Sequence, residues 1–368
     1  MTPGSAGARS VAAATGSVPS ARSAKLAQLL HPPRWLVVVV ALAVLAVIVW
    51  LVVIPQYSSA VRSLATLESL SVPLVALAVV LELASLVAFS GMTATVLGQG
   101  RPHYSTLLRI DLTDLGLNHV VPGGGTTSAA VRFGLLKRVG VASADALTGA
   151  AIEVSASNLM LGVVFGAGLV LSITSFGANA AIAVATVMVA AFFVLAILVC
   201  WILTRHSRRA VTVARELAGR LPLIEPDAVE RVILIMAARI TELLSDSRRL
   251  LRLAVLGALN WLLDAGALWV VLAAFGSPIS PGVLLIVYGL GSILAMLPIT
   301  PGGIGIVEGV MVPALVAFGF PAPVALLGVV GWRLMEYWLP IPLAAAAYLS
   351  LRVTVLRRKA PTRPPVSI

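Results

Sequence analysis

The stretch that decides the fold reads LPITPGGIGIVEGVMV and covers residues 297–312. It is apolar enough for a membrane, yet it holds two prolines, a group of glycines and one glutamate, Glu308. Proline and glycine interrupt helices, and a broken helix is tolerated at membrane depth only where protein or a water-filled cavity covers its free backbone groups. A second stretch, NHVVPGGGTTSAAVRFGLL at residues 118–136, carries the same Pro-Gly-Gly break. The sequence therefore predicts two broken helices inside a membrane protein.

Composition indicates a membrane protein along the whole chain. Of the 368 residues, 59% are hydrophobic and only 11% are charged, whereas a soluble domain has about 25% charged residues. The formal net charge of +11 does not indicate a nucleic-acid partner, because the basic residues lie in short segments between apolar runs, as the positive-inside rule predicts. The single cysteine, Cys200, allows neither a disulfide framework nor a cysteine-ligated metal site. We expect no metal and no cofactor.

Apolar runs predict six full membrane spans and two re-entrant hairpins. The hairpins, residues 105–137 and 281–319, each consist of two half-length apolar stretches on either side of a Pro-Gly-Gly break. If both hairpins return to the side they entered from, both chain ends and nearly all basic residues lie in the cytoplasm. Hairpins that crossed twice would leave the ends inside as well, but their short arms favour re-entry. The predicted spans are residues 36–54, 73–97, 145–171, 178–203, 253–275 and 322–350.

The predicted fold class is an all-α polytopic membrane protein. Residues 1–34 are expected to form a disordered cytoplasmic tail, residues 35–352 a single transmembrane domain, and residues 353–368 a basic cytoplasmic tail. We expect the protein in a bacterial-type plasma membrane, with both termini cytoplasmic.

The order of elements predicts an inverted-topology repeat. Residues 73–171 read span, hairpin, span, and residues 252–351 repeat this order with the hairpin entering from the other side. In secondary transporters such repeats place the binding site near the membrane midplane, where broken helices meet. The connecting residues 205–252 contain apolar residues at helical spacing. They form either an amphipathic helix on the cytoplasmic membrane surface or an ordinary connector.

Charged side chains at membrane depth are the candidate functional residues. Each costs about 2.5–3.5 kcal/mol on insertion scales, so it needs a partner, a cavity or a function. Aligning the two repeats gives each hairpin one charge and the next span the opposite charge: Arg132 with Glu153, and Glu308 with Arg333. We expect these four residues to form one buried cluster whose arginines engage a phosphate. The alternative is that they are salt bridges that hold the hairpins in place.

The glycine turns complete the predicted site. Glycine lets the backbone approach a ligand closely, and the helix that starts after each break points its free amide groups and positive dipole end toward the cavity. A helix-breaking turn without a ligand is the alternative, and two breaks in mirrored positions favour the site. The predicted substrate-binding residues are Asn118, Pro122, Gly123, Gly124, Arg132, Glu153, Pro301, Gly302, Gly303, Gly305, Glu308 and Arg333.

Four further acids lie in or near apolar runs. Asp111 and Asp114 are three residues apart and share one helical face. They are candidates for coupling transport to protons or cations, or else solvated groups at the cytoplasmic mouth. Glu82 and Asp264 are interpreted as helix–helix contacts.

At these residues the sequence resembles the lysylphosphatidylglycerol synthase transmembrane region family. This is the flippase-like membrane domain of bacterial multiple peptide resistance factors, and it also occurs as stand-alone proteins. The resemblance rests on NHVVPGGGTTSAAVRFGLL, PITPGGIGIVEG and GWRLMEYWLP, and extends over about residues 35–352. It implies a polytopic domain that moves lipids such as aminoacylated phosphatidylglycerol between leaflets. The soluble aminoacyl transferase domain of the resistance factors has no counterpart here, so we expect a partner enzyme to make the lipid.

The predicted function is translocation of an anionic or phosphate-bearing lipid by alternating access, with a phospholipid, an aminoacyl-phospholipid or a polyprenyl-phosphate lipid as substrate. One alternative is a membrane-embedded glycosyl or lipid-modifying transferase. Short external loops almost free of acids argue against a transferase. The absence of Walker A, HExxH and GxSxG motifs leaves ATP-driven pumping and these hydrolytic sites without support. The other alternative is an ion-coupled transporter of a small anion, which an inverted repeat also allows.

Overall fold

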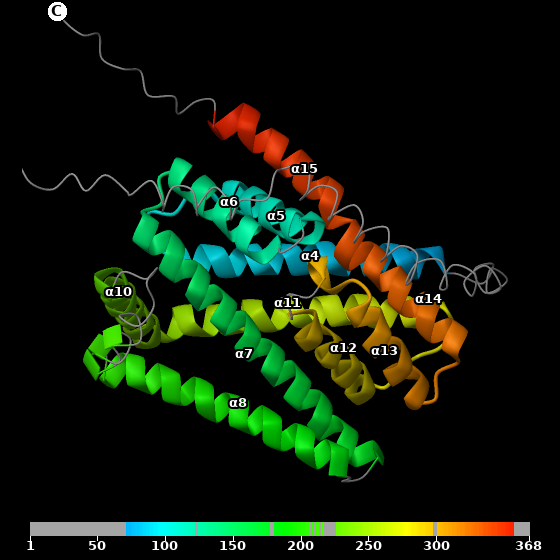
Figure 1. The fold of residues 1–368 in the computed structure, drawn as a ribbon. Helices are drawn as coiled ribbons and strands as arrows, with labels where there is room; N and C mark the ends of the chain where they lie inside the picture. The colour runs from blue at the N-terminus through cyan, green and yellow to red at the C-terminus, as the bar shows by residue number, and fades with distance from the viewer. Residues whose placement is uncertain are drawn as a thin grey trace, which may run out of the picture. The chain divides into compact units, whose positions relative to one another are not determined.

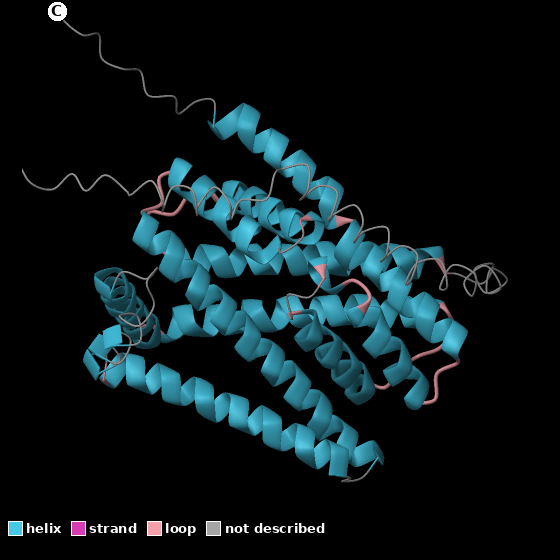
Figure 2. Ribbon diagram, in the orientation of Figure 1, coloured by secondary structure: helices cyan, strands magenta, loops and turns pink. Residues whose placement is uncertain are grey.

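The computed structural model describes residues 71–121, 124–176, 180–206, 208–209, 211–212, 215–216, 226–296 and 300–356. All regular structure in these ranges is helical, and they contain no strand (Figure 2). The predicted first span, the N-terminal tail and residues 357–368 lie outside the described residues. The elements are α4 (Val72–Leu97), α5 (Tyr104–Val120), α6 (Gly124–Arg138), α7 (Ser143–Phe176), α8 (Ala180–Arg205), α10 (Pro226–Ser245), α11 (Ser247–Ala274), α12 (Pro281–Ala295), η3 (Pro301–Gly303), α13 (Ile306–Ala317), α14 (Ala322–Arg333), η4 (Leu334–Trp338), α15 (Pro340–Leu351) and η5 (Arg352–Leu356).

Five helical segments are long and apolar enough to cross a membrane, and each overlaps one of five predicted spans, although Thr186–Arg205 begins later than the predicted span 178–203. The helix α8 shows why these segments need lipid around them. Val187, Met188 and Ile197 are each 67% exposed on its surface, and a soluble protein rarely exposes an apolar surface of this extent. The segments are Val72–Leu97, Ser143–Ile173, Thr186–Arg205, Ser247–Ala274 and Ala322–Val355.

Each predicted hairpin consists of two half-length helices. The first has 17 and 15 residues in α5 and α6, and the second has 15 and 12 in α12 and α13. At 1.5 Å per residue these helices measure about 18–26 Å, less than the roughly 30 Å hydrocarbon core. In the second break, Gly302 and Gly303 have positive φ angles of 54° and 71°, a conformation that side chains with a Cβ rarely adopt. Pro122 and Gly123 of the first break lie outside the described residues.

Helices of the first half of the chain pack against helices of the second half. The helices α4 and α11 pack along each other, α5 packs against α15, and α12 packs against α7 (Figure 1). Glycines permit this close approach, because a Cβ at Gly116 of α5 would collide with the Cβ of Ala344 on α15. A Cβ at Gly168 of α7 would lie 2.7 Å from the Cβ of Leu285 on α12. Small residues at such crossings are typical of helix packing in membranes.

The last predicted span contains a π-helical turn. The helices α14 and α15 are joined through η4, where the Leu339 amide donates to the Leu334 carbonyl, five residues back, at 3.0 Å. Pro340 and Pro342 follow directly, and proline cannot supply the amide that a regular helix needs. The wider turn places Met335 and Tyr337 in the protein interior. π-helical turns occur frequently at functional sites.

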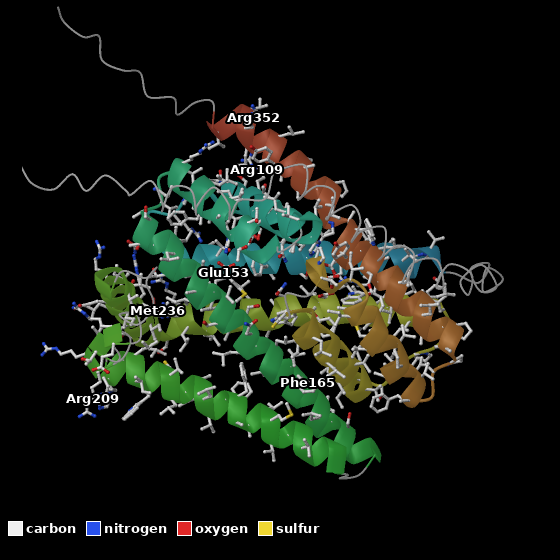
Figure 3. All side chains as sticks on the ribbon, in the orientation of Figure 1. Arg109, Glu153, Phe165, Arg209, Met236 and Arg352 are labelled. Atoms are coloured by element: carbon white, nitrogen blue, oxygen red, sulfur yellow. The ribbon has the colours of Figure 1, made fainter. Side chains whose placement is uncertain are left out.

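The predicted helix in the linker is present as α10. It packs against α7, α8 and α11, and it buries Ala237 and Leu243. Met236 lies on this helix (Figure 3). Arg239 forms an ion pair with Asp145 in the first turn of α7. This contact ties the linker to a candidate span, while its position on the membrane surface stays a prediction.

Candidate functional site

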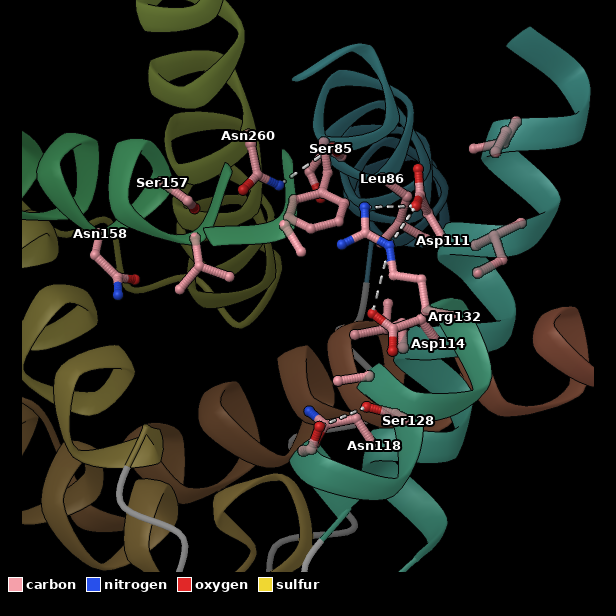
Figure 4. Close-up of a pocket in the computed structure, with 18 of the residues that line it drawn as sticks. Ser85, Leu86, Asp111, Asp114, Asn118, Ser128, Arg132, Ser157, Asn158 and Asn260 are labelled. Carbon is pink, nitrogen blue, oxygen red and sulfur yellow. Dashed lines mark hydrogen bonds and ion pairs between the residues drawn. The ribbon is translucent and has the colours of Figure 1, made fainter. Parts of the chain in front are cut away.

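A cavity of about 700 Å³ lies among α4, α5, α6, α7 and α11 (Figure 4). Its wall is mostly apolar, and side chains of Asn118, Asn158 and Asn260 reach it from three different helices. The charged residues that line it are mostly acidic, with five carboxyl groups and one guanidinium group. They are Glu82, Asp111, Asp114, Asp264 and Glu336, with Arg132 as the only base among the described lining residues.

Arg132 on α6 is the centre of the first charged cluster. It contacts Asp111 on α5 at 2.9 Å and Glu153 on α7 at 2.7 Å, and its side chain is only 7% exposed. Asp114 lies at the outer limit of an ion pair, 4.0 Å away. Thr93 on α4 accepts a hydrogen bond from Arg132 at 2.9 Å and donates one to Glu153 at 3.0 Å. One guanidinium group therefore joins four helices.

Arg333 on α14 is the centre of the second cluster. It contacts Glu308 on α13 at 2.9 Å and Glu336 on η4 at 2.6 Å. It also donates to the Gly302 carbonyl at 2.8 Å, inside the second break. Its guanidinium carbon lies 4.7 Å from the centre of the Tyr337 ring, a distance at which cation–π attraction acts.

Both predicted ion pairs are present, but the predicted single cluster of four is not. Among the described residues, no ion pair connects the Arg132 cluster to the Arg333 cluster. The cavity is lined by Arg132, and Arg333 reaches it only through its partner Glu336. Neither arginine is free, because carboxylates already occupy both.

The second glycine turn receives an anion from the protein itself. The amide of Gly305 donates to the Glu308 carboxylate at 2.6 Å, and Glu308 caps the first turn of α13. A carboxylate at this position complements the positive end of the helix dipole. The Gly305 amide is thus already paired with Glu308, and binding of a ligand anion at this turn stays a prediction.

Tyr337 lies between the two breaks. Its ring stacks on that of His119, which closes α5 just before the first break. A Cβ at Gly302 would collide with the same ring, so the second break needs glycine at this point. The two breaks are therefore held against one aromatic side chain.

The structure does not bring all the predicted site residues together. Asn118, Arg132, Asp111 and Asp114 line the cavity. Glu153 forms an ion pair with Arg132 but is not among the residues that line the cavity. Gly124 begins α6. Pro122 and Gly123 lie outside the described residues. The remaining six belong to the second break and its cluster and are not among the residues that line the cavity: Pro301, Gly302, Gly303, Gly305, Glu308 and Arg333.

The sequence interpretation assigned Glu82 and Asp264 to helix contacts; they lie on α4 and α11, which pack along each other, and both also line the cavity. Asp264 accepts hydrogen bonds from the Tyr288 hydroxyl at 2.8 Å and the Trp332 indole at 2.6 Å. Glu82 is 2% exposed and has only a long hydrogen bond from Ser85, 3.4 Å. Their presence as single acids inside long apolar spans was the signal available in the sequence.

The chain matches a known family of membrane proteins. Residues 34–344 match the family described as Lysylphosphatidylglycerol synthase TM region. The chain belongs to this family. Three relatives, each named UPF0104 membrane protein and each from Methanothermobacter thermautotrophicus, are 32%, 31% and 33% identical over 89, 91 and 96 residues. These matches cover 24–26% of the chain and 26–27% of each relative. The chain thus aligns with about a quarter of the length of each relative.

Proposed function

We propose that this protein moves a phosphate-bearing lipid between membrane leaflets by alternating access. The observation that carries the proposal is the cavity, in which Arg132, three aspartates and three asparagines line a partly open space among apolar helices. Its volume of about 700 Å³ lies within the roughly 300–1,000 Å³ typical of small-molecule sites. A lipid head group would occupy this polar space while its acyl chains stay in the surrounding hydrocarbon.

The charge of the cavity supports a particular kind of head group. Five carboxyl groups and one guanidinium group line it, so a free small anion would meet mainly like charge. A head group that carries an ammonium group beside its phosphate would pair the ammonium group with carboxylates of the cavity, and its phosphate would replace one of the carboxylates that now contact Arg132. This charge pattern favours an aminoacyl-phospholipid or an amine-bearing phospholipid over a polyprenyl phosphate.

The reciprocal packing of the two halves supports an inverted repeat, in which α4 to α7 form one copy and α11 to α15 form the other. The first hairpin packs on the last span of the second half through α5 and α15. The second hairpin packs on the last span of the first half through α12 and α7. A two-fold axis that relates α4 to α11 would produce this reciprocal pattern. In transporters with such repeats, one half rocks against the other around a fixed central site.

The family membership and the apolar helices support a multi-pass position in a membrane. A cell membrane with both termini in the cytoplasm is proposed from the distribution of basic residues between the apolar runs. The lipid would be made by a separate partner enzyme. In this scheme the protein contributes binding and passage, and its charged residues serve the head group.

Reconstitution tests the proposal. Purified protein in liposomes would be compared with protein-free liposomes, using fluorescent phospholipids whose head groups are anionic, zwitterionic or cationic. We expect faster leaflet exchange with protein, greatest for head groups that carry an ammonium group. If no labelled phospholipid exchanges faster than in protein-free liposomes, the proposal fails.

A matched pair of variants tests the site. Arg132→Lys keeps one positive charge but loses the planar fork that holds two groups at once, so we expect a folded protein with at least tenfold slower exchange. The control is Arg109→Lys. Arg109 on the same hairpin donates to Ser350 at 3.0 Å and Thr354 at 3.1 Å and does not line the cavity (Figure 3). Equal rates for both variants would remove Arg132 from the binding site.

A further inference from the structure

Glu82 and Asp264 form a buried pair of carboxyl groups in the cavity wall. Glu82 comes from α4 and Asp264 from α11, the two helices that pack along each other. The two side chains are near enough for a hydrogen bond if one of them carries a proton. Asp264 already accepts from Tyr288 and Trp332. The Oε2 atom of Glu82 is buried and has no hydrogen-bond partner.

These two acids differ from the other carboxyl groups of the site. Asp111, Asp114 and Glu153 share Arg132, and Glu308 and Glu336 share Arg333. Within the described ranges, no lysine, arginine or histidine pairs with Glu82 or Asp264. A buried carboxylate without a counter-charge is strongly unfavourable, and two of them side by side repel each other. Adjacent carboxyl groups resolve this conflict by sharing one proton.

We propose that Glu82 and Asp264 form a proton-binding site that holds one proton between them. The proton would occupy the position in which Glu82 Oε2 lacks a partner, with the other carboxyl group as acceptor. This assignment differs from the sequence interpretation, in which Asp111 and Asp114 were the candidates for ion coupling. Asp111 is fully engaged, since it accepts from Ser90 at 2.8 Å and contacts Arg132 at 2.9 Å.

The surroundings favour a proton over a metal cation. Both oxygen atoms of Asp264 are used by Tyr288 and Trp332, which leaves few free ligands. No group of three or more His, Cys, Asp or Glu that could hold a metal ion occurs in the part of the chain that the structure describes. The other titratable groups that face the pair are Tyr288 from α12 and Glu336 from η4. Glu336 contacts Arg333 at 2.6 Å and shares this cation with Glu308.

Proton binding at this position would affect lipid transport, an inference that rests on the proposed function. The pair joins α4 of one half to α11 of the other and lies in the wall of the cavity. Loss of the proton would create like charges across this contact and favour its separation. Proton binding and release would thus shift the equilibrium between the two arrangements of the halves. A pH gradient would then drive lipid movement.

Infrared spectroscopy tests the proton site without any lipid transport. Wild-type protein at neutral pH should show the C=O band of a protonated carboxyl group, and titration to alkaline pH should remove it. The band should be lost in Glu82→Gln and in Asp264→Asn and retained in Asp111→Asn, which removes an arginine-paired acid from the same cavity. If the wild type lacks the band at neutral pH, or if both substitutions leave it unchanged, the proton site is wrong. Absence of the band from the wild type at neutral pH overturns the proposal even where a variant does not fold.

Proteoliposomes test the coupling. An imposed pH gradient should change wild-type lipid exchange severalfold, Glu82→Gln should abolish this response, and a sodium gradient should have no effect. A response to sodium alone, or an unchanged pH response in Glu82→Gln, would overturn the coupling. If no lipid moves under any condition, the proposed function fails and coupling fails with it, while the infrared result still decides whether the carboxyl pair holds a proton.

Discussion

His119 and Tyr337 bind each other through both their rings and their backbones. Their ring centroids lie 4.4 Å apart with planes inclined by 16°. His119 Nδ1 lies 3.0 Å from the Tyr337 carbonyl, and the Tyr337 hydroxyl donates to the His119 carbonyl. His119 precedes the first helix break and Tyr337 covers Gly302 of the second. The contacts of this pair therefore connect the two broken helices.

Tyr337→Phe tests this connection. The substitution keeps the stacked ring but leaves the buried carbonyl of His119 without its donor, which typically costs about 1–3 kcal/mol. We expect a lower melting temperature in detergent, followed by tryptophan fluorescence. Tyr348→Phe is the control, because Tyr348 is 38% exposed on α15. Equal melting temperatures for the two variants would show that the hydroxyl does not hold the breaks together.

Gly302→Ala tests the need for glycine in the second break. The new methyl group would collide with the Tyr337 ring, and the φ angle of 54° is strained for alanine. We expect loss of most folded protein on size-exclusion chromatography. Gly309→Ala is the matched control, since a Cβ there meets nothing within 4 Å and lies inside α13. Normal yield of Gly302→Ala would mean that this backbone geometry is not required.

Arg132→Gln tests whether Arg132 holds four helices together. It leaves Asp111 and Glu153 buried without their cation, and breaking a buried ion pair costs about 3–5 kcal/mol. We expect strong destabilisation in thermal unfolding, partly restored when Glu153→Gln is added, because the second change removes one unpaired charge. Arg109→Gln, outside the cavity, should change stability far less. Additive losses in the double variant would contradict a direct coupling of Arg132 to Glu153.

Gly168→Ala tests the close crossing of α7 and α12. A methyl group there would lie 2.7 Å from the Leu285 Cβ and 2.9 Å from the Ile286 nitrogen, so backbone must move. Overpacking of this kind costs about 1–3 kcal/mol, and we expect a lower melting temperature. Gly134→Ala on α6 is the control, because its Cβ would meet nothing within 4 Å. A tolerated Gly168→Ala would mean that the crossing is looser than described.

Much of the architecture was predictable because a membrane restricts the choices. Five predicted spans and the two half-length helix pairs follow from apolar length and from the Pro-Gly-Gly breaks. The pairs Arg132 with Glu153 and Glu308 with Arg333 were predictable because the repeat alignment brought opposite charges into matching positions. Entry of the hairpins from opposite sides stays a prediction.

The roles of individual acids were not predictable. Asp111 and Glu82 both lie in or near apolar runs of the sequence, but Asp111 contacts Arg132 and Ser90 while Glu82 lies beside Asp264. The partner of each acid comes from another helix, far away in the chain. Likewise, the sequence could not reveal that Glu308 accepts a hydrogen bond from the Gly305 amide. Nor could it reveal that Glu336 is the member of the Arg333 cluster that lines the cavity.

By itself the sequence determined that this chain lies in a membrane and breaks two of its helices, because hydrophobic length and proline are local properties of the chain. Only the tertiary structure decided which charges meet, which of them face the cavity, and that His119 and Tyr337 join the breaks. These contacts depend on how α4, α5, α7, α11 and α15 cross one another. Crossing geometry arises from glycine contacts between distant segments, which no local pattern encodes.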